Sequence, residues 1–77
     1  MADTITKKEG LIVLYALEAE LKLYKKNTRG LSALLKDVKE SLRFIQSCSV
    51  DERTISLIVE EKKRMVQEFV LSHKEDV

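Results

Sequence analysis

The sequence contains one cysteine, Cys48, and one histidine, His73. A paired thiol and imidazole could form a nucleophile and its base, but this chemistry also needs an oxyanion hole and a rigid cleft. A short helical chain has little room for either, and the pair would have to join the C-terminal tail to the end of the second predicted helix. We therefore expect no catalytic residues and a protein that is not an enzyme.

Metal binding is not indicated either. A lone histidine without a neighbouring cysteine or carboxylate cluster is a poor metal site, so we expect no metal and no cofactor. Glu60 and Glu61, like Asp51 and Glu52, are adjacent in the sequence and diverge by about 100° on a helix. We expect these carboxylates to be solvated or to cap helices. Cys48 is expected to be a buried small hydrophobe, with a redox or intersubunit disulfide role as the alternative.

A cluster of cations is the strongest candidate for a binding site, and we call it the basic stripe: Lys22, Lys25, Lys26 and Arg29. The spacing places the four on one face if the first helix extends that far. Helix C-termini favour cations and Glu18 can pair with Lys22, which together give a purely structural explanation. Contact with phosphate or with an acidic partner is the alternative.

The composition indicates one small helical domain comprising residues 1–77. The chain is 44% hydrophobic and 35% charged, has a net charge of +1, and contains no proline and only two glycines. That net charge does not imply a nucleic-acid partner. The longest apolar run, Leu11–Leu17, is far shorter than the ~20 residues of a membrane span and is followed by no cleavage pattern, so we expect a cytoplasmic protein without membrane contact.

Three helices are predicted, at about 7–26, 29–46 and 50–72, with frayed ends at 1–5 and 73–77. Thr6 and Glu9 fit a capping box, and Ser49 and Glu52 fit a second one. The segment 27–30 is the best turn candidate, although without a proline the first two helices could instead form one rod. The charged run 60–64 interrupts the third apolar face, unless the Lys62 stem covers the gap.

The first helix carries an apolar face with 3-4-3 spacing, which we call the association stripe: Leu14, Leu17, Leu21 and Tyr24. The run 11–17 is apolar on every face, and a domain of this size has little core with which to cover it. The fold class is therefore expected to be all-α, a small antiparallel bundle of two to three helices completed by self-association.

These expectations together lead to a predicted function. We expect a protein–protein interaction module (an adaptor, regulator or inhibitor) that docks an apolar helix face on another protein, and a homodimer formed through the association stripe. The basic stripe would form the polar rim of that surface. The alternative is a small nucleic-acid-associated regulator that uses the basic stripe. Direct base readout is disfavoured, because the second helix begins with apolar residues where a recognition helix carries polar ones.

Overall fold

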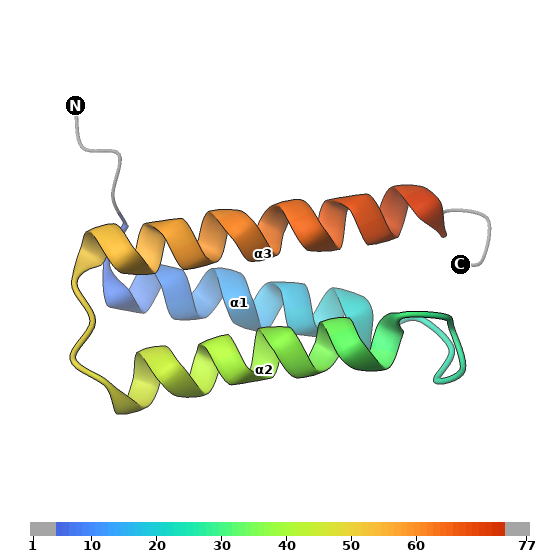
Figure 1. The fold of residues 1–77 in the computed structure, drawn as a ribbon, viewed down its shortest axis with the longest axis horizontal. Coiled ribbons are helices and arrows are strands. Elements are labelled where there is room, and N and C mark those ends of the chain that lie inside the picture. The colour runs from blue at the N-terminus through green and yellow to red at the C-terminus, as the bar shows by residue number, and fades with distance from the viewer. Residues whose placement is uncertain (1–4, 74–77) are drawn as a thin grey trace.

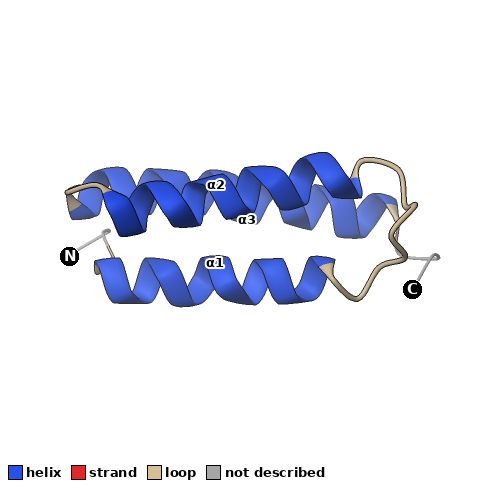
Figure 2. Ribbon diagram, turned by 90° about the horizontal axis from the view of Figure 1, so that it is seen from below, coloured by secondary structure: helices blue, strands red, loops and turns tan. Residues whose placement is uncertain are grey.

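The protein is described by a computed structural model over residues 5–73. Three helices make up most of this part: α1 (Lys7–Leu21), α2 (Leu31–Ser47) and α3 (Glu52–Ser72). The chain runs up, down and up again, and α1 packs against both other helices (Figures 1 and 2). The predicted all-α antiparallel bundle is confirmed, in its three-helix form, and residues 5–73 contain no strand.

The predicted capping box is present at the start of α1. The Thr6 hydroxyl accepts a hydrogen bond from the Glu9 amide at 3.1 Å, and the Glu9 carboxylate accepts one from the Thr6 amide at 3.0 Å. Both bonds satisfy donors that the first helical turn leaves free. One residue earlier, the Ile5 amide donates to the Ser56 hydroxyl at 2.8 Å, which ties the entry of α1 to α3.

The end of α1 was predicted wrongly: the helix stops at Leu21, not at residue 26. The chain then tightens, with the Leu23 amide bonded to the Glu20 carbonyl at 3.1 Å and the Tyr24 amide to the Leu21 carbonyl at 3.2 Å. These bonds span three residues, so they keep Tyr24 on the same side as Leu21, as a further helical turn would. Apolar spacing alone therefore could not locate the end of the helix.

The connection between α1 and α2 confirms the predicted turn and excludes a single rod. Gly30 has φ 82°, a left-handed conformation that glycine adopts without the penalty that a Cβ brings. The Thr28 amide donates to the Lys25 carbonyl and the Leu31 amide to the Thr28 carbonyl, so two successive tight turns build this loop.

The connection between α2 and α3 lies close to its predicted position, but the predicted cap is wrong. Asp51 is the N-cap of α3, and its carboxylate accepts a hydrogen bond from the Thr54 amide at 3.3 Å. Ser49 therefore lies outside the helix, and Glu52 is its first residue. A carboxylate caps as well as a hydroxyl does and also favours the positive end of the helix dipole, which explains why Asp51 takes the position.

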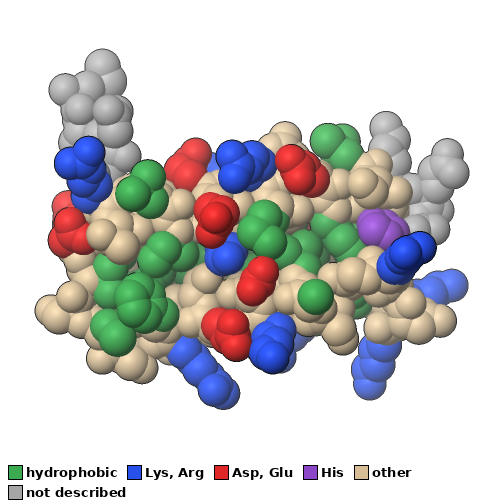
Figure 3. Space-filling view, viewed as in Figure 1, with side chains coloured by type: hydrophobic (Ala, Val, Ile, Leu, Met, Phe, Trp, Pro, Cys, Tyr) green, Lys and Arg blue, Asp and Glu red, His purple; other side chains and the backbone are tan. Residues whose placement is uncertain are grey.

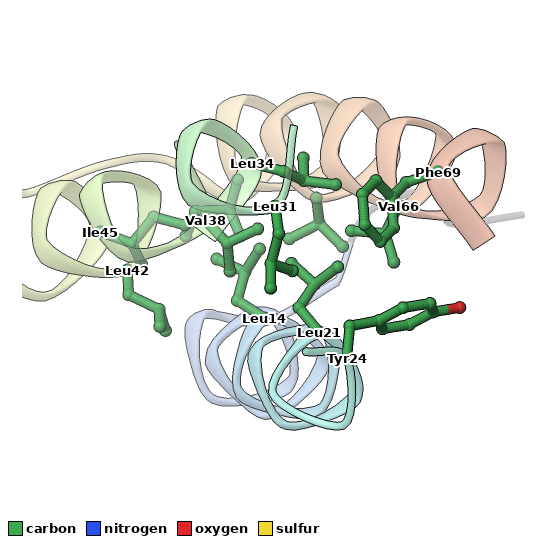
Figure 4. Packing of buried hydrophobic residues seen from close by; sticks show 12 residues of the cluster. Leu14, Leu21, Tyr24, Leu31, Leu34, Val38, Leu42, Ile45, Val66 and Phe69 are labelled. Atoms are coloured by element: carbon green, nitrogen blue, oxygen red, sulfur yellow. The ribbon is translucent and has the colours of Figure 1, made fainter. Parts of the chain in front are cut away.

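The core lies where the three helices meet (Figure 4). Twelve hydrophobic side chains are buried there: Leu14, Leu21, Tyr24, Leu31, Leu34, Val38, Leu42, Ile45, Ile55, Val59, Val66 and Phe69. The Tyr24 and Phe69 rings meet edge to face with their centroids 5.0 Å apart, a favourable aromatic geometry that fastens the α1–α2 loop to α3.

Of the two alternatives for the charged run of α3, the structure has the one in which the Lys62 stem covers the gap. The Lys62 side chain is mostly buried, and its Nζ reaches the Glu61 carboxylate at 3.4 Å and the Met65 sulfur at 3.9 Å. The hydrocarbon part thus continues the inner face of α3 while the ammonium group stays near water. Over residues 5–73, no helix combines the length and the apolar character needed to cross a membrane.

Candidate functional site

The association stripe does not form an exposed face. Leu14 and Leu21 are fully buried and Tyr24 is nearly so, all within the core of the single chain. These three side chains are therefore not available on the surface of the folded protein for docking. Leu17, the fourth member, is only half-buried and packs at the edge of the core. The stripe was recognised correctly as an apolar helix face, but α2 and α3 cover most of it.

The apolar run 11–17 is covered only in part. Leu11, Val13 and Leu17 pack at the edge of the core, while Ile12 is 58% and Tyr15 is 49% exposed. Two neighbouring helices thus leave one side of this run in contact with solvent, as its uniform apolar character predicts. The Tyr15 hydroxyl accepts a hydrogen bond of 2.8 Å from the Gln46 amide group, so its polar end is satisfied by α2.

Leu17 lines a surface groove between α1 and α3. The groove has a volume of about 500 Å³, and its lining residues are Leu17, Glu20, Lys63, Val66, Gln67, Val70 and Leu71. Four of these are aliphatic: Leu17 comes from α1, and Val66, Val70 and Leu71 come from the last turns of α3. An apolar floor with a polar rim is the usual arrangement of a surface that receives an apolar side chain from a partner.

Leu71 is the outermost apolar residue of this groove, with 64% of its surface exposed. Across the groove, Glu20 from α1 and Lys63 from α3 place opposite charges on its two rims. Lys63 also lies 3.4 Å from Glu60, an exposed pair one turn apart that contributes little to stability. The rim charges therefore remain available for a partner. Sequence reasoning missed this site, because its residues come from two helices distant in the chain.

A second groove lies between α2 and α3. It measures about 220 Å³ and is lined by Asp37, Glu40, Ser41, Phe44, Ile58, Glu61 and Lys62. Three carboxylates surround its two apolar residues, and charged and apolar side chains are interspersed on this face (Figure 3). This groove is smaller and more polar than the α1–α3 groove, so it is the weaker candidate for apolar docking.

The basic stripe does not lie on a helix face, because α1 ends at Leu21, before all four of its members. Lys22 is the C-cap of α1, and its ammonium lies 3.8 Å from the Glu18 carboxylate, which confirms the predicted pairing. Lys25, Lys26 and Arg29 belong to the loop and are exposed. Arg29 lines a different groove, beside Phe69 and His73. The single cationic face that the spacing predicted is therefore absent.

Cys48 and His73 are separated by the length of α3. Cys48 precedes the first turn of that helix and His73 follows its last, so the two lie at opposite ends of the bundle (Figure 1). A helix of this length holds them about 30 Å apart, too far for a thiol–imidazole pair. Cys48 is also exposed, which corrects the expectation of a buried side chain. Its position at the C-cap, where α2 leaves the core, explains the exposure.

The predicted frayed ends fall mostly on residues 1–4 and 74–77, which lie outside the described part of the chain. His73 itself is half-buried. Its ring stacks on Phe69 with centroids 4.3 Å apart, and Nδ1 lies 3.0 Å from the Phe69 carbonyl oxygen. A carbonyl only accepts, so Nδ1 carries a proton in this arrangement and the imidazole closes the C-terminal turn of α3. The contacts give His73 a structural role as a helix cap.

Within the described part of the chain, no group of three metal-ligating side chains converges. The carboxylates with shifted pKa values are helix caps. Hydrogen bonds from Thr6, chiefly from its backbone amide, lower the pKa of Glu9. Hydrogen bonding to the Thr54 side chain is the main cause that lowers the pKa of Asp51. Neither shift indicates acid–base chemistry.

The comparisons with known proteins give no family for this chain. No family model, no curated protein and no solved structure matches it.

Proposed function

We propose that the chain is a non-enzymatic interaction module that docks through the α1–α3 groove, and that its first partner is a second copy of itself. The observation that carries this proposal is the position of the exposed Leu71 at the edge of a groove with an apolar floor. A protruding leucine and a groove that could receive one lie on the same face. Such a face can pair with an identical face turned about a two-fold axis.

The apolar contribution of Leu71 would favour a dimer. Burial of a leucine side chain stabilises an interface by about 1.5–3 kcal/mol, and a two-fold interface buries the residue twice. Leu17 and Val70, which are half-buried in the single chain, would be covered further. Positions at the centre of an interface, ringed by polar groups, contribute most of the binding energy in protein complexes.

The rim charges favour a second copy over an unrelated partner. Glu20 lies on one side of the groove and Lys63 on the other. A two-fold axis that runs along the groove would bring Lys63 of one copy toward Glu20 of the other, and the reverse, so both rims would meet an opposite charge. A partner that carried one sign of charge would instead meet a like charge on one rim, which disfavours binding.

A dimer of this kind would act sterically. Two bundles joined along α1 and α3 would present the remaining helix faces to other proteins in fixed positions, and could scaffold one partner or block another. No chemical step is required, which agrees with the wide separation of Cys48 and His73.

The test is the molar mass of the folded protein by sedimentation equilibrium, for the wild type and two variants. Leu71→Glu changes the groove, and Leu57→Glu is its matched control, because Leu57 is a similarly exposed leucine on α3 (67%) that does not line the groove. We expect a wild-type dimer at tens of micromolar, an unchanged dimer for Leu57→Glu, and a dissociation constant at least tenfold larger for Leu71→Glu.

A monomeric wild type at these concentrations would contradict the proposal. Equal dissociation constants for both variants would contradict the assigned surface. Circular dichroism serves as the fold control, and because both leucines are largely exposed, neither substitution should reduce the helix content.

A further inference from the structure

One serine and three cations form a row on α2, apart from the basic stripe. Ser32, Lys36, Lys39 and Arg43 follow each other at 4-3-4 spacing and are all exposed. On a helix of 3.6 residues per turn these positions fall within about 60° of one another, so they share one face. We call these four residues the α2 basic row. They line one shallow groove of about 410 Å³ together with Leu35 and Glu40.

The cations of this row are not neutralised by the fold. Among the residues that the structure describes, neither Lys36, Lys39 nor Arg43 forms an ion pair. Glu40 lies one turn from Lys36 without pairing to it, and it is the one acidic residue of the groove. The helix dipole does not explain the three cations either, since it favours cations in the last turn and none of the three lies in the last turn of α2.

From this arrangement we propose that the α2 basic row binds the phosphate backbone of a nucleic acid without reading its sequence. The rise of a helix places Lys36 and Arg43 about 10 Å apart. One strand of a duplex carries a phosphate every ~3.4 Å along its axis, so the row can contact about three successive phosphates. Lysine, arginine and serine are the side chains that most often donate to phosphate oxygens.

The lining of the groove favours a nucleic acid over an acidic protein. Leu35 is its one apolar residue, and it is half-buried against the core. Protein interfaces have an apolar centre, which this row lacks, whereas phosphate contacts require none. The row is also separate from the α1–α3 groove, so this inference does not depend on the proposed dimer.

The experiment measures fluorescence anisotropy of two labelled probes, a 20-base-pair DNA duplex and a 20-nucleotide RNA, from 20 to 200 mM salt. The test variant is Lys36→Gln with Lys39→Gln. The control is Arg53→Gln with Arg64→Gln, which removes the same charge from exposed positions on α3. Poly-glutamate is tested as a competitor, because it offers carboxylates in place of phosphates.

We expect the logarithm of the duplex affinity to fall against that of the salt concentration with a slope of about −2.7, or about −2.1 for RNA. The test variant should bind at least tenfold more weakly at low salt and lose about 1.8 of the duplex slope, and Arg43→Gln alone should lose about 0.9. The control should keep the wild-type slope. The dissociation constants of the two probes at one salt concentration identify which nucleic acid binds better.

Three results would overturn the inference: no binding of either probe at 20 mM salt, equal losses in the test and control variants, or displacement of both probes by an equal charge of poly-glutamate. The last result would assign the row to an acidic protein.

Discussion

Gly10 of α1 lies directly against Ile55 of α3: a Cβ added to the glycine would stand 2.6 Å from the Ile55 Cγ2 atom. That distance is shorter than any van der Waals contact, so the two helices approach each other here only because residue 10 has no side chain. The Ile55 methyl branches from Cβ and cannot move away without a change of χ1, which a helix restricts strongly for isoleucine. The close approach therefore depends on glycine.

Gly10→Ala should accordingly destabilise the protein, although alanine is the better helix former. Overpacking typically costs about 1–3 kcal/mol, and the gain in helix propensity offsets up to about 1 kcal/mol. We expect a net loss of about 1–2 kcal/mol in the free energy of unfolding, measured by urea denaturation.

The control for this prediction is a double-mutant cycle with Ile55→Ala, which removes the opposing methyl group. If the clash is the cause, the double variant should be more stable than the sum of the two single losses predicts, by at least 0.5 kcal/mol. Additive losses would show that Gly10 acts through its own helix only.

Tyr24 should be essential for the position of the α1–α2 loop. It is nearly buried and meets Phe69 edge to face. Truncation of a buried aromatic residue to alanine costs about 3–5 kcal/mol, so we expect Tyr24→Ala to unfold the chain or come close to it. Tyr24→Phe keeps the ring contact and should change the stability by less than about 1 kcal/mol. A stable Tyr24→Ala variant would mean that the side chain does not hold the loop in the core.

Stability should fall in acid through the two helix-capping carboxyls. The pKa values of Glu9 and Asp51 are lower in the folded protein than their ordinary values of 4.5 and 3.8. Folding therefore favours the charged forms, and the stability that they contribute is complete above the ordinary pKa values and is lost as the pH falls through the lowered ones.

The combination Glu9→Gln with Asp51→Asn keeps side chains that can cap but removes both titrations. We expect the free energy of unfolding of this variant to depend less on pH below about 4.5 than that of the wild type, as followed by thermal melts. An unchanged acid dependence would place its origin in other carboxyls.

The helices and the start of α1 could be predicted from local patterns, whereas the end of α1 and the surfaces could not. The capping box of Thr6 and Glu9 requires only that the two residues be three apart, so the sequence contains all of that information. The end of α1 depends on where Tyr24 packs, because the ring contacts Phe69, a residue on another helix. Periodicity cannot distinguish a tight turn from a helical turn when both bury the same side chains.

The candidate site illustrates the same limit. Leu17 could be identified as a member of an apolar face, but its partners in the groove, Val70 and Leu71, come from the far end of the chain. Only the packing of α3 beside α1 shows that Leu14 is covered while Leu17 borders an open groove. Likewise, Cys48 is exposed because α2 ends there, beyond the last core residue of the helix. The residues next to Cys48 in the sequence do not indicate this.

In the proposed dimer two copies pair across the α1–α3 groove with Glu20 of each facing Lys63 of the other, and reversal of these charges is the sharpest test of that pairing. Glu20→Lys places two positive rims in contact, and Lys63→Glu places two negative ones. Each variant should therefore dimerise more weakly than the wild type, by about 1 kcal/mol or more for each pair of charges.

The decisive measurement is the sedimentation velocity of an equimolar mixture of these two variants. In the mixed pair each Lys at position 20 meets a Glu at position 63, and each native Glu20 meets a native Lys63, so both contacts are attractive again. If the proposed dimer forms, each variant alone should sediment as a monomer and the mixture should sediment as a dimer. A mixture that stays monomeric, or single variants that dimerise as well as the wild type, would contradict it.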